Sequence, residues 1–192
     1  MRFGFAGFRS LASVFLLIIL SGSLCASDSI DCGAIDEKAR QIDRLPNREV
    51  KKTLRTGTDR GGALSAFWYE GQIRHVKVTI GMSNRQVESS YYYEDGQLIF
   101  AASKQSFFLW DPEAQQLDPG KIAMSFEDRF YFVDGKLKQW NTTRAAADLS
   151  NQNSDIAKEN ETVLKQSNFF MKTARDVKDR VDVEGFIKRG AP

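Results

Sequence analysis

The chain has 192 residues, the length of one domain, and 42% of them are hydrophobic and 27% charged, with 27 lysines and arginines against 25 aspartates and glutamates. This composition is too apolar for a disordered chain and too charged for a protein with many membrane-spanning segments. One histidine and two cysteines leave almost no ligands for a zinc site, a haem or an iron–sulfur cluster, so we expect no metal and no cofactor.

Residues 1–26 have the pattern of a secretory signal peptide. Arg2 and Arg9 are the only charged residues of this segment, and residues 11–20 form a mostly apolar run. Such a run is about half of the ~20 residues that a helix needs to cross a bilayer, which favours cleavage at the end of the segment over a retained anchor. We therefore expect an exported protein, periplasmic or secreted, with no integral membrane segment after cleavage.

Removal of this segment changes the charge balance. It takes away two of the 27 basic residues and leaves 25 of each sign, so the basic pI of about 8.5 belongs to the signal. A neutral domain with interspersed charges has no electrostatic footprint for nucleic acid, which we exclude as a partner. Cleavage after Ala26 would leave Cys32 as the only thiol. We expect Cys32 to be a small buried residue; the alternative is a disulfide to another molecule.

Residues 27–62 are expected to form a short amphipathic helix followed by a loop. Apolar residues recur at helical spacing over 29–45. Ser29 or Asp31 can cap the start of this helix, and Pro46 ends the pattern. The last residues of the region are glycine-rich and polar, which is typical of a loop.

Residues 63–140 contain 15 of the 22 aromatic residues and carry the clearest pattern of the sequence. Asp95-Gly96 and Asp134-Gly135 are typical of type I′ turns, in which both central residues need a positive φ. The pattern predicts an antiparallel meander of about six short strands. Three segments each place three aromatic residues before a short polar link, a glycine, a Gln or Lys and an Ile or Leu: 67–73, 91–98 and 130–137.

Within this meander we expect one long loop. Residues 111–113 and 117–120 contain the Asp-Pro and Pro-Gly dipeptides that mark turns and loops. The spacing between the turn glycines is uneven, which argues against a solenoid and for one sheet with a loop insertion.

The aromatic-x-x-Gly-Lys-Leu hairpins resemble the units of MORN-variant proteins. They are also similar to a set of uncharacterised exported bacterial proteins in which an N-terminal helix precedes such hairpins. The resemblance covers residues 63–140, and it implies a sheet of hairpins but no catalytic residues.

Residues 141–154 have the composition of a polar linker, and residues 155–192 are expected to form a long amphipathic helix, over 155–181, and a tail. Asn160 and Ser167 interrupt its apolar stripe, so a strong coiled coil is not indicated. The helix should pack across the sheet; the alternative is a free helix that binds a partner. With the N-terminal helix and the meander, this predicts an α+β fold. The stripe consists of Ile156, Val163, Phe170 and Val177, with Met171 among the residues beside it.

Few residues could carry catalysis. His75 lies in a predicted strand, without a Gly-x-Ser-x-Gly motif anywhere, and we do not expect it to be catalytic. Glu94-Asp95 and Glu127-Asp128 could be imagined as the acid and base of a glycan hydrolase. However, Asp95 is explained by its turn, and Glu127 and Asp128 should point to opposite faces of a strand. The alternative function is a carboxylate-dependent envelope hydrolase acting on glycan, with Glu94 or Glu127 as the acid.

Surface recognition remains as the favoured function. Three consecutive tyrosines cannot all face inward, because side chains alternate across a strand, and exposed aromatics favour contact with protein or glycan. A covering helix that buries them is the equal alternative. We predict a non-enzymatic exported binding or envelope-accessory protein, whose partner is an unknown protein or glycan of the cell envelope. The candidate binding residues are Tyr91, Tyr92, Tyr93, Phe170 and Met171.

Overall fold

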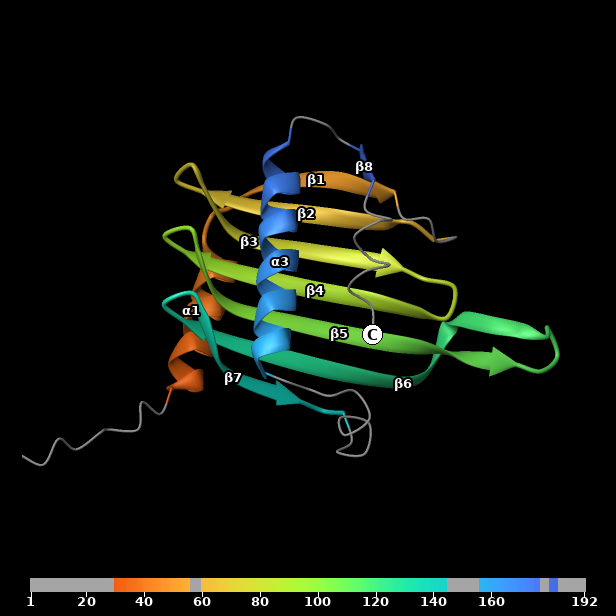
Figure 1. Ribbon diagram of the computed structural model, residues 1–192. Coiled ribbons are helices and arrows are strands. Elements are labelled where there is room, and N and C mark those ends of the chain that lie inside the picture. Colours follow the sequence, from red (N-terminus) through yellow and green to blue (C-terminus); the bar gives the residue numbers. More distant parts are fainter. Residues whose placement is uncertain (1–29, 56–59, 145–155, 177–179, 183–192) are drawn as a thin grey trace, which may run out of the picture.

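The protein is built on one sheet that carries a helix on each face (Figure 1). The expected α+β fold, with an N-terminal helix, an antiparallel meander and a C-terminal helix, is confirmed. The signal segment, the second cysteine Cys25 and most of the predicted linker lie outside the described residues. The computed structural model describes residues 30–55, 60–144, 156–176 and 180–182.

Seven strands follow one another as antiparallel neighbours, and a short eighth strand lies parallel to the first, in the order β7-β6-β5-β4-β3-β2-β1-β8. The sheet thus has one more antiparallel strand than the predicted six. The strands are β1 (Arg48–Arg55), β2 (Gly62–Tyr69), β3 (Gln72–Gly81), β4 (Arg85–Glu94), β5 (Gln97–Asp111), β6 (Gln116–Val133), β7 (Lys136–Thr142) and β8 (Arg180–Asp182).

The additional strand is β1, whose residues lie between the predicted helix and the predicted loop. Five of its eight residues are charged, which conceals the alternation of apolar and polar residues that would predict a strand. On one face of the strand, Leu54 and Lys52 are buried. The Lys52 ammonium donates a hydrogen bond to the backbone carbonyl of Asp176, directly after the C-terminal helix, where a cation is favoured by the helix dipole.

Both predicted turns are confirmed, and Glu70-Gly71 forms a third tight hairpin turn of the same kind. Each has a positive φ at both central residues, as a type I′ turn requires, and the second residue is always glycine. The turns thereby fix the registers of the paired aromatic strands. The φ values are 50° and 76° at Glu70-Gly71, 49° and 79° at Asp95-Gly96, and 51° and 71° at Asp134-Gly135.

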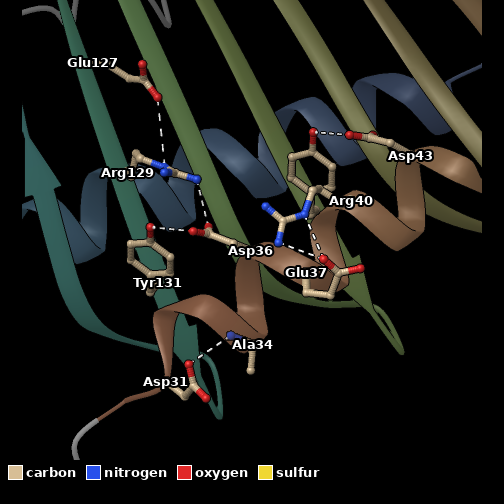
Figure 2. Close-up of polar contacts among 10 residues, drawn as sticks. Asp31, Ala34, Asp36, Glu37, Arg40, Asp43, Glu127, Arg129 and Tyr131 are labelled. Carbon is tan, nitrogen blue, oxygen red and sulfur yellow. Dashed lines mark hydrogen bonds and ion pairs between the residues drawn. The ribbon is translucent and has the colours of Figure 1, made fainter.

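The N-terminal helix α1 (Cys32–Arg44) forms as expected and covers one end of one sheet face (Figure 1). Asp31 is the cap, and its carboxylate accepts a hydrogen bond of 3.0 Å from the Ala34 N–H (Figure 2). Ala39 and Ile42 are buried against the sheet. A small core between α1 and the sheet also contains Tyr92, Phe100 and Tyr131.

The C-terminal helix α3 (Ile156–Arg175) crosses the strands on the opposite face (Figure 1). Val163 and Phe170 of its apolar stripe and the neighbouring Ala174 are buried in the larger core, whereas Ile156, at the start of the stripe, is exposed. The expectation that it packs on the sheet is therefore confirmed. The helix ends before the predicted residue 181, because residues 180–182 form β8 instead.

The predicted long loop is wrong, because β5 and β6 continue through most of it. The two strands remain paired beyond the start of β4, as far as Asp111 and Gln116. They form a two-stranded projection that extends past the rest of the sheet (Figure 1). We call residues 107–124 the arm.

The proline that suggested a loop is accommodated by an irregularity in β6. Phe108 pairs with Ile122, whereas the next residue, Leu109, pairs with Asp118. Pro119 lies between these two partners, where its missing N–H breaks no regular ladder bond. A bulge therefore reconciles the Pro-Gly dipeptide with an extended hairpin.

Candidate interaction surface

The single histidine lies in a closed environment beneath α1. His75 of β3 places its Nδ1 3.1 Å from a carboxylate oxygen of Asp43. Its ring stacks between those of Phe67 and Tyr92, at centroid distances of 4.9 and 4.1 Å. The residue is 7% exposed, and its Nε2 has no hydrogen-bond partner among the described residues. The imidazole is covered on both ring faces, so a substrate has no access to it.

The polar residues around this histidine attach α1 to the sheet. One Asp43 oxygen accepts a hydrogen bond of 3.1 Å from the Tyr92 hydroxyl. Two helical turns away, an Asp36 oxygen lies 2.8 Å from the Arg129 guanidinium of β6, and the other oxygen lies 3.5 Å from the Tyr131 hydroxyl (Figure 2). Both carboxylates of this helix face are thus engaged in docking the helix.

The five predicted binding residues belong to the two cores. Tyr91 and Tyr93 face α3, Tyr92 faces α1, and all three are buried. Phe170 of α3 lies with its ring centroid 5.9 Å from that of Tyr91, and Met171 is partly buried beside the same core. Burial raises the pKa of all three tyrosines, as expected for phenols removed from water. The covering helices therefore occupy the faces that these residues could offer.

The acidic residues considered for hydrolysis do not form a pair. Glu94 is exposed and makes an ion pair of 2.6 Å with Lys38 of α1. Glu127 is exposed, whereas the adjacent Asp128 is buried on the other face of β6 and lies 2.8 Å from the Arg144 guanidinium. No two of these described carboxylates face a common space that could hold a glycosidic bond between them.

Other reactive groups are not gathered into a site. Cys32 is half-buried rather than buried as expected, and desolvation together with the nearby Asp36 and Asp31 carboxylates raises the pKa of its thiol, which disfavours the nucleophilic thiolate. Within the described ranges, no group of His, Cys, Asp and Glu side chains could hold a metal ion. None of the helices in those ranges combines the length and the apolar character needed to cross a membrane.

The arm is the part of the described surface where large apolar side chains gather. Leu109 and Trp110 of β5 are 45% and 55% exposed, and Ile122 and Met124 of β6 are 51% and 54% exposed. The other exposed large hydrophobic residues of the described chain, Val133 of β6 and Ile156 of α3, lie apart from the arm. Four exposed side chains of this kind on one projection are typical of an interaction site.

Two arginines anchor the base of this arm. The Arg85 guanidinium lies over the ring of Phe107, 5.5 Å from its centroid, and the Arg60 guanidinium lies over Phe108 at 4.8 Å. The Phe108 N–H donates a hydrogen bond of 3.0 Å to the Asn84 carbonyl in the turn before β4. These contacts tie the first residues of the arm to the body of the sheet.

The tip of the arm is acidic. An Asp111 oxygen accepts hydrogen bonds of 2.9 and 3.1 Å from the backbone N–H groups of Glu113 and Ala114, which shapes the turn. Asp118 forms an ion pair of 3.3 Å with Lys121. Asp111 and Glu113 make no ion pair with any described residue, so the tip carries uncompensated negative charge.

Comparison with family models, with curated proteins and with solved structures gives no match to the chain. The likeness of the hairpins to MORN-variant units therefore stays a prediction based on the three turns. The arm has no counterpart in that pattern, since its own turn follows no aromatic triplet.

The sequence contained one signal for the arm that our prediction did not use. Residues 107–110 are an unbroken apolar run of Phe, Phe, Leu and Trp next to the Asp-Pro dipeptide. Such a run is typical of a strand, in which the side chains alternate between two faces. An apolar run at the end of a strand therefore indicates that the hairpin continues, here with exposed hydrophobic residues.

Proposed function

We propose that the protein is a non-enzymatic exported protein that binds another protein molecule of the cell envelope through its arm. The observation that carries this proposal is the group of four large apolar side chains exposed on one projecting hairpin. Leu109, Trp110, Ile122 and Met124 offer aromatic and aliphatic surface together, which favours a protein partner over a glycan. The predicted signal peptide supports export to the periplasm or the medium.

The two helices support the same role in a different way. Each helix covers part of one face of the sheet and buries the tyrosines beneath it, so these aromatic residues contribute stability and the arm remains as an accessible apolar surface. In such a protein the function depends on a particular surface site, here the arm, rather than on the fold. The arm is anchored at its base, which reduces the entropy lost when it binds.

Site-specific photo-crosslinking in the intact source cell tests this proposal. A photoreactive amino acid at Trp110 should give a defined crosslinked product, whereas the same amino acid at Ile156 should not. Ile156 is a matched control, because it is 54% exposed but lies on α3, away from the arm. Equal products at both positions, or none at Trp110, would contradict a binding role for the arm.

A substitution makes the test quantitative. Trp110→Ser should weaken capture of the crosslinked partner by about 2 kcal/mol if the indole is an interface anchor. Ile156→Ser should leave it unchanged. Fractionation of the full-length chain tests export separately, since an uncleaved form in the cytoplasm would contradict it.

A further inference from the structure

The arm exposes an unpaired backbone edge. Strand β4 begins at Arg85, which pairs with Phe107 of β5. Residues 109–111 of β5 therefore pair only with β6 and have no described strand on their other side. Unpaired N–H and C=O groups along a strand are a template for pairing with a further strand.

Other edges of the described sheet carry features that discourage such pairing. Exposed Lys136 and Lys138 alternate along the outer strand β7, and charged edge residues oppose association between sheets. On the β6 side of the arm, Pro119 lacks an N–H and the strand is bulged. On the β5 edge of the arm, Leu109 and Trp110 carry neither a charge nor a proline, and the charge of Asp111 lies only at the end next to the tip.

Charges of opposite sign lie at the two ends of the arm. The tip carries Asp111 and Glu113, and the base carries Arg60 and Arg85. Neither arginine makes an ion pair with a described residue; each instead lies over a phenylalanine ring. Burial and the Arg144 guanidinium lower the pKa of Arg85, consistent with a cation that no carboxylate stabilises. An arm with an acidic tip and a basic base is complementary to an antiparallel copy of itself.

We propose that the arm's partner is a second copy of this chain, with the two arms antiparallel and paired along their β5 edges. This inference rests on the proposed function, because it names the protein molecule that the arm binds. A two-fold axis through Trp110 places this residue beside its counterpart and places Leu109 of each copy opposite Asp111 of the other. The exposed Leu109 and Trp110 side chains of both arms then lie along one interface.

The same two-fold axis brings the acidic tip of each arm close to the basic base of the other. In an antiparallel pair centred on Trp110, Asp111 of one copy lies opposite Leu109 of the other, one residue from Phe108. The Arg60 guanidinium of that second copy lies over Phe108, within reach of the acidic tip. Because the interface is two-fold symmetric, every such attraction occurs twice. Glu113, further along the tip, approaches the same basic base.

Charge reversal on the full chain tests this arrangement by sedimentation velocity. The wild type should form dimers at roughly 0.01–0.1 mM, the range of a modest interface. Glu113→Arg and Arg60→Glu should each weaken dimerisation about tenfold or more, since each places like charges together twice. An equimolar mixture of the two variants should form the heterodimer. Glu49→Arg, which reverses an exposed acid on β1, should leave the dimer unchanged.

The mixture keeps the test independent of folding, because a misfolded variant could not restore association. A wild type that is monomeric at about 1 mM overturns the proposal, as does a mixture that stays monomeric. A monomeric wild type that still crosslinks from Trp110 to a different protein would overturn the self-pairing and leave the proposed function intact. A protein that forms neither the dimer nor the crosslink would overturn both the self-pairing and the proposed function.

Discussion

The hydroxyl oxygens of Tyr93 and Ser167 lie 2.9 Å apart where α3 crosses β4. Both side chains are almost fully buried, at 1% exposure each, within a core that is otherwise apolar. A displaced helix would leave two buried hydroxyls without partners. This pair therefore fixes the position of the helix on the sheet, which apolar packing alone specifies less sharply.

Removal of this partner should destabilise the protein. Ser167→Ala deletes one hydroxyl and leaves the Tyr93 hydroxyl with only the Ser167 carbonyl, at 3.3 Å. We expect the free energy of unfolding to fall by about 1–2 kcal/mol, measured by urea denaturation. Asn168→Ala, at the adjacent exposed position of α3, should cost less than about 0.5 kcal/mol.

A double-mutant cycle with Tyr93→Phe distinguishes a direct bond from two separate effects. The double variant should lose clearly less stability than the sum of the two single variants, because the second substitution removes a hydroxyl that the first has already left without its best partner. Additive losses would show that the two hydroxyls act independently.

The same helix shows how much its sequence could predict. The seven-residue spacing identified Val163 and Phe170 as buried positions, and both are buried. Asn160 and Ser167 read only as interruptions of the stripe, yet the Asn160 carbonyl oxygen accepts a hydrogen bond of 2.9 Å from the Leu137 N–H of β7. Periodicity identifies the face of a helix, but the partners of its polar residues depend on tertiary contacts that no local pattern contains.

Sequence reasoning was least informative where local signals conflicted with pairing. Charged residues concealed β1, whose Lys52 is buried because α3 supplies a carbonyl for its ammonium. Asp-Pro and Pro-Gly dipeptides concealed the arm, because a bulge absorbs Pro119 without ending the hairpin. The three tyrosines left two alternatives, and only the positions of both helices decided between them.

Acid should weaken the docking of α1 through Asp43. Burial alone would raise the pKa of this carboxyl, but the hydrogen bond and charge of His75 and the Tyr92 hydroxyl outweigh it, and the net pKa is lowered. A lowered pKa in the folded protein stabilises the fold above the ordinary aspartate pKa of about 4, and this contribution is lost as the pH falls through the lower folded value.

Asp43→Asn should therefore remove part of the acid sensitivity. We expect the free energy of unfolding of the wild type to fall more steeply than that of the variant as the pH decreases below about 4. The two curves should converge at low pH, because the wild-type carboxyl is then protonated and as uncharged as the amide. Parallel curves across this range would show that Asp43 contributes no pH-dependent stability.

The hairpin turn between β4 and β5 should not tolerate a side chain at its second central position. Gly96 has a φ of 79°, and an added Cβ would meet no atom within 4 Å, so any cost comes from the backbone conformation alone. Gly96→Ala should destabilise the protein by about 1 kcal/mol in thermal or urea unfolding. Gly33→Ala, in the first turn of α1, needs no positive φ, although its Cβ would lie 3.2 Å from the Asp31 cap oxygen, and should cost less than Gly96→Ala. Equal losses in both variants would contradict this account of the turn.

A buried ion pair and an exposed one should respond differently to loss of the cation. Asp128 is 2% exposed, and it accepts hydrogen bonds of 2.8 Å from Arg144 and 3.1 Å from the Trp140 indole. Arg144→Met leaves this carboxylate buried without its cation and should cost about 3–5 kcal/mol in urea denaturation. Lys38→Met breaks the exposed pair with Glu94 and should cost less than about 1 kcal/mol. The double variant Asp128→Leu with Arg144→Met should regain part of the lost stability, because no buried charge remains. A double variant less stable than Arg144→Met alone would show that the Asp128 carboxylate stabilises the fold chiefly through its hydrogen bond with Trp140.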